Sequence, residues 1–243
     1  MQIAGTLLAY YISKIIGAIY QIYYQDQMEE KKMATNINGY LKAVNEEITK
    51  NKEYLTELDG AIGDADHGIN MARGFNAVVP KITDEDKDVG ATLKKVGMTL
   101  ISTVGGASGP LYGTAFMKAG AEAVGQETID LTAMEKMLTA ALTGIKDRGK
   151  AVKGEKTMID AIEPAIEALK SAHEQGKSIA DCLDLALKAA EEGIEFTKTI
   201  RATKGRASYL GDRSIGHQDP GATSFYIMLK AATDYYKANG MEG

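Results

Sequence analysis

D-G-A-I-G-D-A-D-H-G-I-N-M-A-R-G, residues 59–74, interrupts a chain that otherwise follows helical periodicity almost throughout. The helical pattern on either side stops at its edges, so we expect a glycine-rich loop between two helices. Asp59, Asp64 and Asp66 repel one another unless a cation neutralises them, and a hard cation accepts oxygen ligands. Their separations of five and two residues suit a loop folded round an ion better than one helical face. The stretch therefore predicts a magnesium site, with an acidic helix cap as the simpler alternative.

Outward from this loop, the apolar spacing predicts about eight helices after residue 35 and no sheet. The first helix starts at residue 36 and reaches the acidic loop. Pro164 predicts a kink or a late start in the helix at 158–169, and Ser178 is the expected N-cap of the helix at 179–196. The pattern indicates an all-α fold, an antiparallel bundle or barrel of helices. The expected helices lie at 36–58, 69–79, 89–104, 111–124, 131–145, 158–169, 179–196 and from 219–220 onward.

Composition limits the partners. The 243 residues carry a net charge of −5 and a pI near 5.4, which argues against nucleic acid as the main partner because binding its backbone needs a basic face. A bound polyanion must then be held locally, by metal and backbone N–H groups. The single cysteine, Cys182, lies on an apolar helix face and excludes an internal disulfide. This cysteine usage predicts a reducing, cytoplasmic compartment.

Residues 1–32 differ from the rest of the chain. Residues 3–24 are almost continuously apolar and aromatic, about the length of a membrane span, but Ser13, Lys14 and Gln21 interrupt them. Three interpretations compete: an amphipathic docking helix, a weak membrane anchor, and an appended segment unrelated to the domain. We favour the appended segment, so that residues 33–243 form the domain.

Four segments are candidates for binding phosphate. His67 and Asn70 start the helix after the acidic loop, where N–H groups favour anions, although a neutral capping histidine is an alternative. The glycine-rich break at 105–110 offers bare N–H groups and the Ser108 hydroxyl. The segment at 154–158 places Thr157 and Met158 near a nucleotide, or Thr157 caps a helix. A basic loop at 199–218 either screens a polyphosphate or is merely solvated; its candidate cations are Lys204, Arg206 and Arg213.

Four motifs together resemble the nucleotide-binding L subunits of dihydroxyacetone kinases, in the order found in that family. They are G-D-A-D-H-G-I-N-M-A-R-G (63–74), G-G-A-S-G-P-L-Y-G-T (105–114), G-E-K-T-M (154–158) and T-K-G-R-A-S-Y-L-G-D-R-S-I-G-H-Q-D-P-G (203–221). The resemblance covers about residue 33 to the end. Ala65 stands where the family often has glycine or serine, a departure that should not affect metal ligation.

The resemblance implies an eight-helix antiparallel barrel with ADP or ATP bound among loops at one end. Asp59, Asp64 and Asp66 would hold two magnesium ions. Contacts to the phosphates or ribose would come from His67, Asn70, Ala107 and Ser108, and the rest of the nucleotide pocket from Gly149, Met158, Arg206, Asp219 and Pro220.

The family comes in two kinds, one fused to a substrate-binding K domain that uses ATP and one a separate subunit with permanently bound ADP. Because no K domain accompanies this sequence, we expect the second kind. Its partners would be a K subunit, which holds dihydroxyacetone, and a phosphohistidine protein of the phosphoenolpyruvate phosphotransferase system, which rephosphorylates the ADP. Alternatives are an ATP-dependent kinase subunit for another short sugar and an interaction module that binds a transcription regulator. A homodimer is a further expectation.

Overall fold

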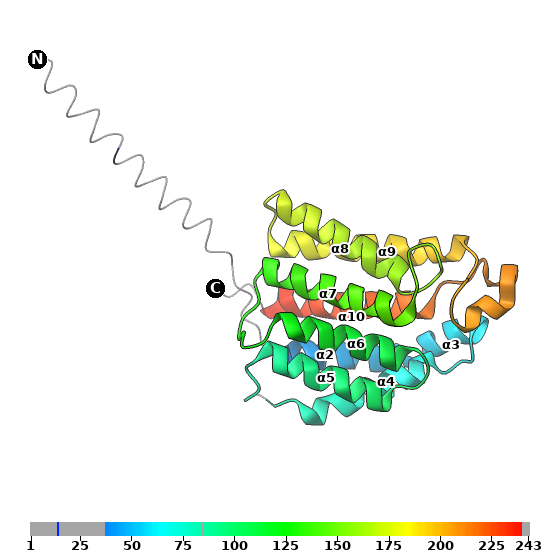
Figure 1. Ribbon diagram of the computed structural model, residues 1–243, viewed down its shortest axis with the longest axis horizontal. Helices are drawn as coiled ribbons and strands as arrows, with labels where there is room; N and C mark the ends of the chain where they lie inside the picture. The colour runs from blue at the N-terminus through cyan, green and yellow to red at the C-terminus, as the bar shows by residue number, and fades with distance from the viewer. Residues whose placement is uncertain (1–13, 15–36, 84, 240–243) are drawn as a thin grey trace, which may run out of the picture. The chain divides into compact units, whose positions relative to one another are not determined.

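A computed structural model describes Lys14, residues 37–83 and residues 85–239 (Figure 1). The regular elements in these ranges are all helices, as predicted. They are α2 (Ile37–Lys50), α3 (Lys52–Ile62), α4 (His67–Val78), the 3-10 helix η1 (Val79–Lys81), α5 (Val89–Thr103), α6 (Ser108–Glu122), α7 (Leu131–Gly149), α8 (Ile159–Glu174), α9 (Ile179–Thr199), the 3-10 helix η2 (Arg206–Ser214) and α10 (Pro220–Asn239).

Eight of the α-helices close a ring. Each contacts the next in the order α2, α4, α5, α6, α7, α8, α9, α10, and α10 returns to α2 (Figure 1). Most successive members are joined by short connections that make neighbours antiparallel; the exceptions are α2 to α4, with α3 between them, and α9 to α10, joined by residues 200–219. The additional helix, α3, packs against α4, α10 and η2. The prediction of an all-α, eight-helix antiparallel barrel is therefore confirmed, with one helix more than the sequence pattern indicated.

The extra helix arises at the start of the domain. Asn51 separates α2 from α3, and α3 continues to Ile62, so Asp59 lies in a helix and not in the loop that we expected to begin there. The connection to α4 is only residues 63–66. The helix continues because Ile62 is buried against Ala202 and Ala207, which come from the loop before α10. That contact is between distant parts of the chain, and Ile62 also keeps the helical spacing of Leu55 and Leu58.

Other helix boundaries follow the predicted chemistry. α6 starts at Ser108 with Pro110 in its first turn, where proline is tolerated. α8 starts at Ile159 and continues through Pro164. The Ser178 hydroxyl accepts the N–H of Asp181 at 3.1 Å, which confirms the predicted N-cap of α9. Cys182 is fully buried in the cluster shared by α8, α9 and α10, which confirms its place in the core.

Close packing and an internal cavity characterise the barrel. α5 and α6 approach so closely at Gly97 and Gly113 that a Cβ on Gly97 would lie 2.6 Å from the carbonyl oxygen of Gly113. An apolar cavity of about 280 Å³ lies inside the ring, lined by side chains of α2, α5, α6, α7 and α10 among others.

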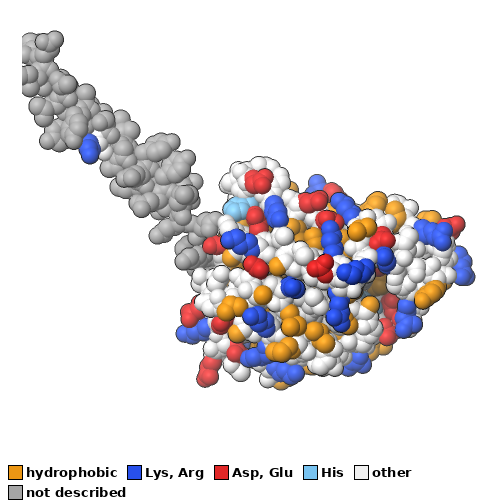
Figure 2. Space-filling view, viewed as in Figure 1, with side chains coloured by type: hydrophobic (Ala, Val, Ile, Leu, Met, Phe, Trp, Pro, Cys, Tyr) orange, Lys and Arg blue, Asp and Glu red, His pale blue; other side chains and the backbone are white. Residues whose placement is uncertain are grey.

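The chain divides into two units, Met1–Lys32 and Met33–Gly243. Apart from Lys14, the segment that we expect to be an appended extension lies outside the described residues. No helix in the described part of the chain is long and apolar enough to span a membrane. On the face of the domain in Figure 2, acidic and basic side chains are interspersed, as suits a protein that is not expected to bind nucleic acid.

Candidate metal and nucleotide site

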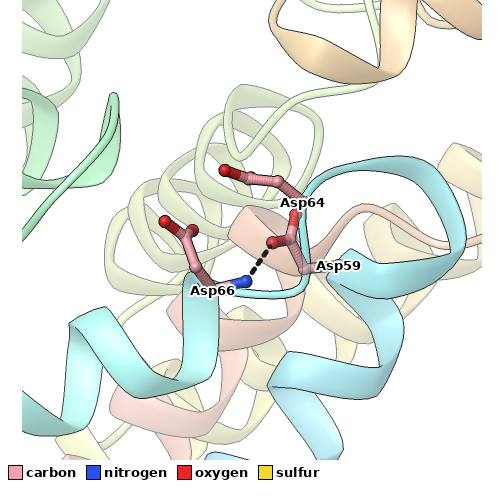
Figure 3. Close-up of side chains that lie close together, drawn as sticks. All are labelled: Asp59, Asp64 and Asp66. Atoms are coloured by element: carbon pink, nitrogen blue, oxygen red, sulfur yellow. Dashed lines mark hydrogen bonds between the residues drawn. The ribbon is translucent and has the colours of Figure 1, made fainter.

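Three aspartates converge where α3 passes into α4. Asp59 lies in the last turn of α3, Asp64 in the connection and Asp66 immediately before α4 (Figure 3). One carboxylate oxygen from each lies within 4.8 Å of the other two. Asp59 is buried, Asp66 is half-buried and Asp64 is exposed, so the cluster opens toward solvent on one side. The three residues therefore form the cluster that their spacing predicted.

The local backbone fixes this cluster. The Oδ2 atom of Asp59 accepts the N–H groups of Asp66 at 2.9 Å and His67 at 3.2 Å, which orients its carboxylate. Gly63 leaves room for it, because a Cβ there would lie 2.1 Å from Asp59 Oδ1. Ala65 has a φ of 58°, a left-handed conformation that costs a non-glycine residue about 1 kcal/mol. That backbone favours glycine at position 65 over any residue with a Cβ.

The donor set fits a hard divalent cation. Three carboxylates within reach of one another supply oxygen ligands only, as magnesium prefers. Some of their charge is already compensated, because Arg206 Nη2 lies 2.9 Å from Asp64 Oδ2. Asp59, Asp64 and Asp66 are thus the residues that would hold metal, and a cation there would stabilise a cluster that otherwise repels itself.

A pocket of about 400 Å³ lies beside the aspartates and brings the separate loops together. Its walls come from the α3–α4 connection, the glycine-rich segment before α6, the α7–α8 connection and the loop before α10. Every residue that the family resemblance assigns to metal or nucleotide lines it except Asn70. Those lining it are Asp59, Asp64, Asp66, His67, Ala107, Ser108, Gly149, Met158, Arg206, Asp219 and Pro220.

Asn70 does not line the pocket but lies behind the residues that do. It is buried, and its Oδ1 accepts a hydrogen bond from Arg73 at 2.5 Å. A Cβ on Gly105 would lie 3.0 Å from the same oxygen, so Asn70 packs directly against the glycine-rich segment. Among the basic residues of the last loop, Lys204 and Arg206 line the pocket, whereas Arg213 is not among its lining residues.

His67 links three helices through a buried chain of hydrogen bonds. Its Nδ1 lies 3.0 Å from the Ser108 hydroxyl on α6, and its Nε2 lies 2.9 Å from the Ser224 hydroxyl on α10. The Tyr112 hydroxyl extends the chain, 2.8 Å from Ser224. Burial lowers the pKa of His67 more than the charges of Asp59 and Asp66 raise it, so the ring is neutral at pH 7. His67 therefore supports Ser108; the N-cap of α4 is Asp66, not His67.

Ser224 and Tyr112 were not found from the sequence. Both occupy ordinary positions within amphipathic helices, and only the closed ring of helices brings them to His67. Thr157 lines the pocket, and its hydroxyl accepts the N–H of Ile159 at 3.2 Å, although the N-cap position of α8 is Met158.

Asp219 lies in the pocket wall formed by the loop before α10. Its Oδ2 accepts the N–H of Ala222 at 2.7 Å and so caps α10. Burial raises its pKa to about 7, against the opposing effects of that hydrogen bond and of the Lys156 charge. The wall therefore holds a carboxyl group that ionises near neutrality.

The helical ring, with an acidic cluster and glycine-rich segments at one end, corresponds to a known class of domain. The family model described as the DAK2 domain matches residues 61–234, and the chain belongs to this family.

Two members of this family are similar to the chain over most of its length. The chain is 47% identical over 197 residues to the PEP-dependent dihydroxyacetone kinase, ADP-binding subunit DhaL, of Escherichia coli (strain K12), covering 81% of this chain and 94% of that protein. It is 48% identical to the corresponding subunit of kinase 1 of Listeria innocua, covering 79% and 91%.

A solved structure has the same fold. The dihydroxyacetone kinase from C. freundii, in complex with AMP-PNP and Mg²⁺, superposes with a TM-score of 0.60 at 24% identity. The match covers 81% of this chain and 33% of that one, so the chain spans about a third of the larger kinase.

Proposed function

We propose that this chain is the ADP-binding subunit of a dihydroxyacetone kinase, a phosphotransferase subunit that presents the phosphoryl group from a bound nucleotide. The observation that carries the proposal is the convergence of three aspartates and a glycine-rich segment on one pocket. It is supported by relatives named as ADP-binding subunits, whose lengths the chain matches almost fully.

Within the pocket, Asp59, Asp64 and Asp66 hold magnesium, and two ions are the expected number. The metal neutralises phosphate charge when bound. Ala107 and Ser108 offer hydrogen bonds to phosphate oxygens from the N-terminal end of α6. The remaining predicted contacts come from His67, Asn70, Gly149, Met158, Arg206, Asp219 and Pro220, with Asn70 acting from behind Gly105.

The chain supplies half of an active site. Phosphoryl transfer asks the protein mainly for positioning and charge neutralisation, which the pocket provides. The acceptor, dihydroxyacetone, is held by a separate K subunit, and the nucleotide is recharged in place by a phosphohistidine protein of the phosphotransferase system. The relatives named PEP-dependent support this version over free exchange with ATP. With its single buried cysteine, the subunit is proposed to work in the cytoplasm.

Mass spectrometry of the nucleotide released on denaturation tests the proposal first. ADP with magnesium is expected, and phosphate transfer to dihydroxyacetone is expected only when both partner proteins are added. Turnover supported by bulk ATP alone would exclude the phosphotransferase-linked version. Transfer to another short sugar with a different K subunit would identify the second candidate acceptor.

Two finer partner assignments belong to the same proposal: a transcription regulator and a second copy of the chain. Pull-down of a DNA-binding regulator by the nucleotide-loaded protein tests the first. Light scattering across protein concentration tests the second, because a homodimer doubles the measured mass. Neither partner is needed for phosphoryl transfer.

A further inference from the structure

Lys156 is an almost completely buried cation, 1% exposed, in the segment G-E-K-T-M. Its Nζ donates to the carbonyl oxygens of Thr197 at 2.5 Å and Ile200 at 3.4 Å, and also to that of His217. An ammonium group has three N–H donors, so these three carbonyls use all of them. None is left for a phosphate in the adjoining pocket.

The three carbonyls lie at the two ends of one loop. Thr197 is in the last turn of α9 and Ile200 directly follows that helix, whereas His217 stands shortly before α10. Carbonyls at a helix C-terminus have no partner within the helix and attract a cation. A single side chain therefore joins the start of residues 200–217, the Arg206 loop, to its end.

Two other hydrogen bonds also join the start of the Arg206 loop to its end; we call this junction the neck. The N–H of Gly216 donates to the Lys198 carbonyl at 2.8 Å, and the N–H of Ala202 donates to the Ser214 hydroxyl at 2.9 Å. The backbone of Lys156 itself is left-handed, with a φ of 59°. Such a backbone is unfavourable for lysine, and the three hydrogen bonds of its ammonium offset the cost.

Beyond the neck, the loop carries Arg206 to the acidic cluster. Arg206 begins η2, and its guanidinium lies 2.9 Å from Asp64 Oδ2. η2 also contacts α3, the helix that ends beside the cluster (Figure 1). The place of Arg206 over the pocket thus depends on a loop with both ends tied to Lys156.

We propose that Lys156 is a positioning residue that closes the neck of the Arg206 loop and so holds Arg206 at the phosphate end of the pocket, and is not itself a phosphate ligand. The inference rests on the proposed function, because the position of Arg206 matters only if the pocket receives phosphate. Removing the ammonium takes this partner from the buried carbonyl of Thr197 and from the partly buried carbonyls of Ile200 and His217, which favours opening of the neck.

Amine labelling of the intact protein separates the two roles of Lys156 without any mutation. We expect Lys156 to resist acetylation both in the free protein and with Mg-ADP, whereas Lys204, which lines the same pocket with 36% of its side chain exposed, reacts in the free protein. Labelling of Lys156 in the free protein, followed by protection with Mg-ADP, would overturn the proposal.

A double-mutant cycle then tests the route through Arg206. Lys156→Met and Arg206→Gln are each expected to raise the Kd for Mg-ADP roughly tenfold, and the double variant to bind no more weakly than either. Additive losses would show that Lys156 acts independently. Lys153→Met is the matched control, because Lys153 is exposed and pairs with Glu167 at the surface, 3.7 Å away.

Hydrogen exchange supplies the readout specific to the neck. In the nucleotide-free Lys156→Met protein, amides of residues 200–217 should exchange at least about tenfold faster, while α5 and α6 stay protected. Unchanged exchange in this loop would refute the proposal. Failure of the unmodified protein to bind Mg-ADP would contradict the proposed function. Amine labelling and hydrogen exchange would still test whether Lys156 closes the neck. If Lys156→Met does not fold, the labelling pattern decides.

Discussion

Asp219→Asn should make the metal-free, nucleotide-free protein more stable at neutral pH. The Asp219 side chain is half-buried in the pocket wall, and desolvation of its carboxyl raises the pKa from an ordinary 3.8 to about 7. Asparagine keeps the side-chain oxygen that accepts the Ala222 N–H, and it is as good an N-cap as aspartate. The substitution therefore removes the ionisable group and leaves the cap.

The sign and size follow from linkage. Between about pH 4 and pH 7 the folded protein keeps a proton that the unfolded chain has released, so folding stability falls as pH rises through this window. At about 1.4 kcal/mol for each unit of pKa, the full loss is on the order of 4 kcal/mol. Above pH 7 both states are ionised and the loss is complete. The asparagine variant has no such loss.

Urea unfolding from pH 4 to pH 8, in a metal chelator after removal of nucleotide, measures this difference. The variant should match the wild type near pH 4 and exceed it increasingly toward pH 7. Asp88→Asn is the control: Asp88 caps α5, and the Ala91 N–H lowers its pKa, so its stabilisation is lost as pH falls. The same pH dependence for wild type and Asp219→Asn would refute the reasoning.

Three further outcomes are expected. Asp64→Ala should abolish tight binding of magnesium and ADP, measured by calorimetry, while circular dichroism stays helical; retained ADP would contradict the metal assignment. Gly68→Ala should lower the free energy of unfolding by about 2 to 4 kcal/mol, because its Cβ would lie 2.0 Å from the Lys52 carbonyl oxygen. Tyr112→Phe should cost about 1 kcal/mol in urea unfolding, since it removes only the hydroxyl that bonds Ser224 and the Gly221 carbonyl; an unchanged midpoint would argue against these bonds.

The point where α3 ends and the acidic loop begins could not be placed from the local sequence pattern. Asp59, Gly60 and Gly63 suggested a loop after Leu58, yet α3 continues to Ile62, which keeps the helical spacing of Leu55 and Leu58 and is buried against Ala202 and Ala207. Asp59 is accordingly a helical residue whose carboxylate is held by two N–H groups of the next segment. A single-sequence pattern reports which face of a helix is apolar, but not what a distant loop places against its last turn.

Lys156 illustrates the same limit at the site. Its neighbours in the sequence suggested contact with a nucleotide, and nothing local indicated three backbone carbonyls from the ends of a later loop. The relay from His67 to Ser224 and Tyr112 is likewise formed only when α4, α6 and α10 meet.

By itself the sequence determined the all-helical class, the positions of most helices and the chemistry of the acidic and glycine-rich segments. Periodicity, capping residues and the repulsion of close carboxylates are local properties, and they are readable along the chain. Only the tertiary structure decided that the loops meet at one pocket, that Asn70 lies behind it and that Lys156, although it lines the pocket, gives its ammonium to backbone carbonyls. Those facts depend on how the eight ring helices close, and so on contacts between residues far apart in the chain.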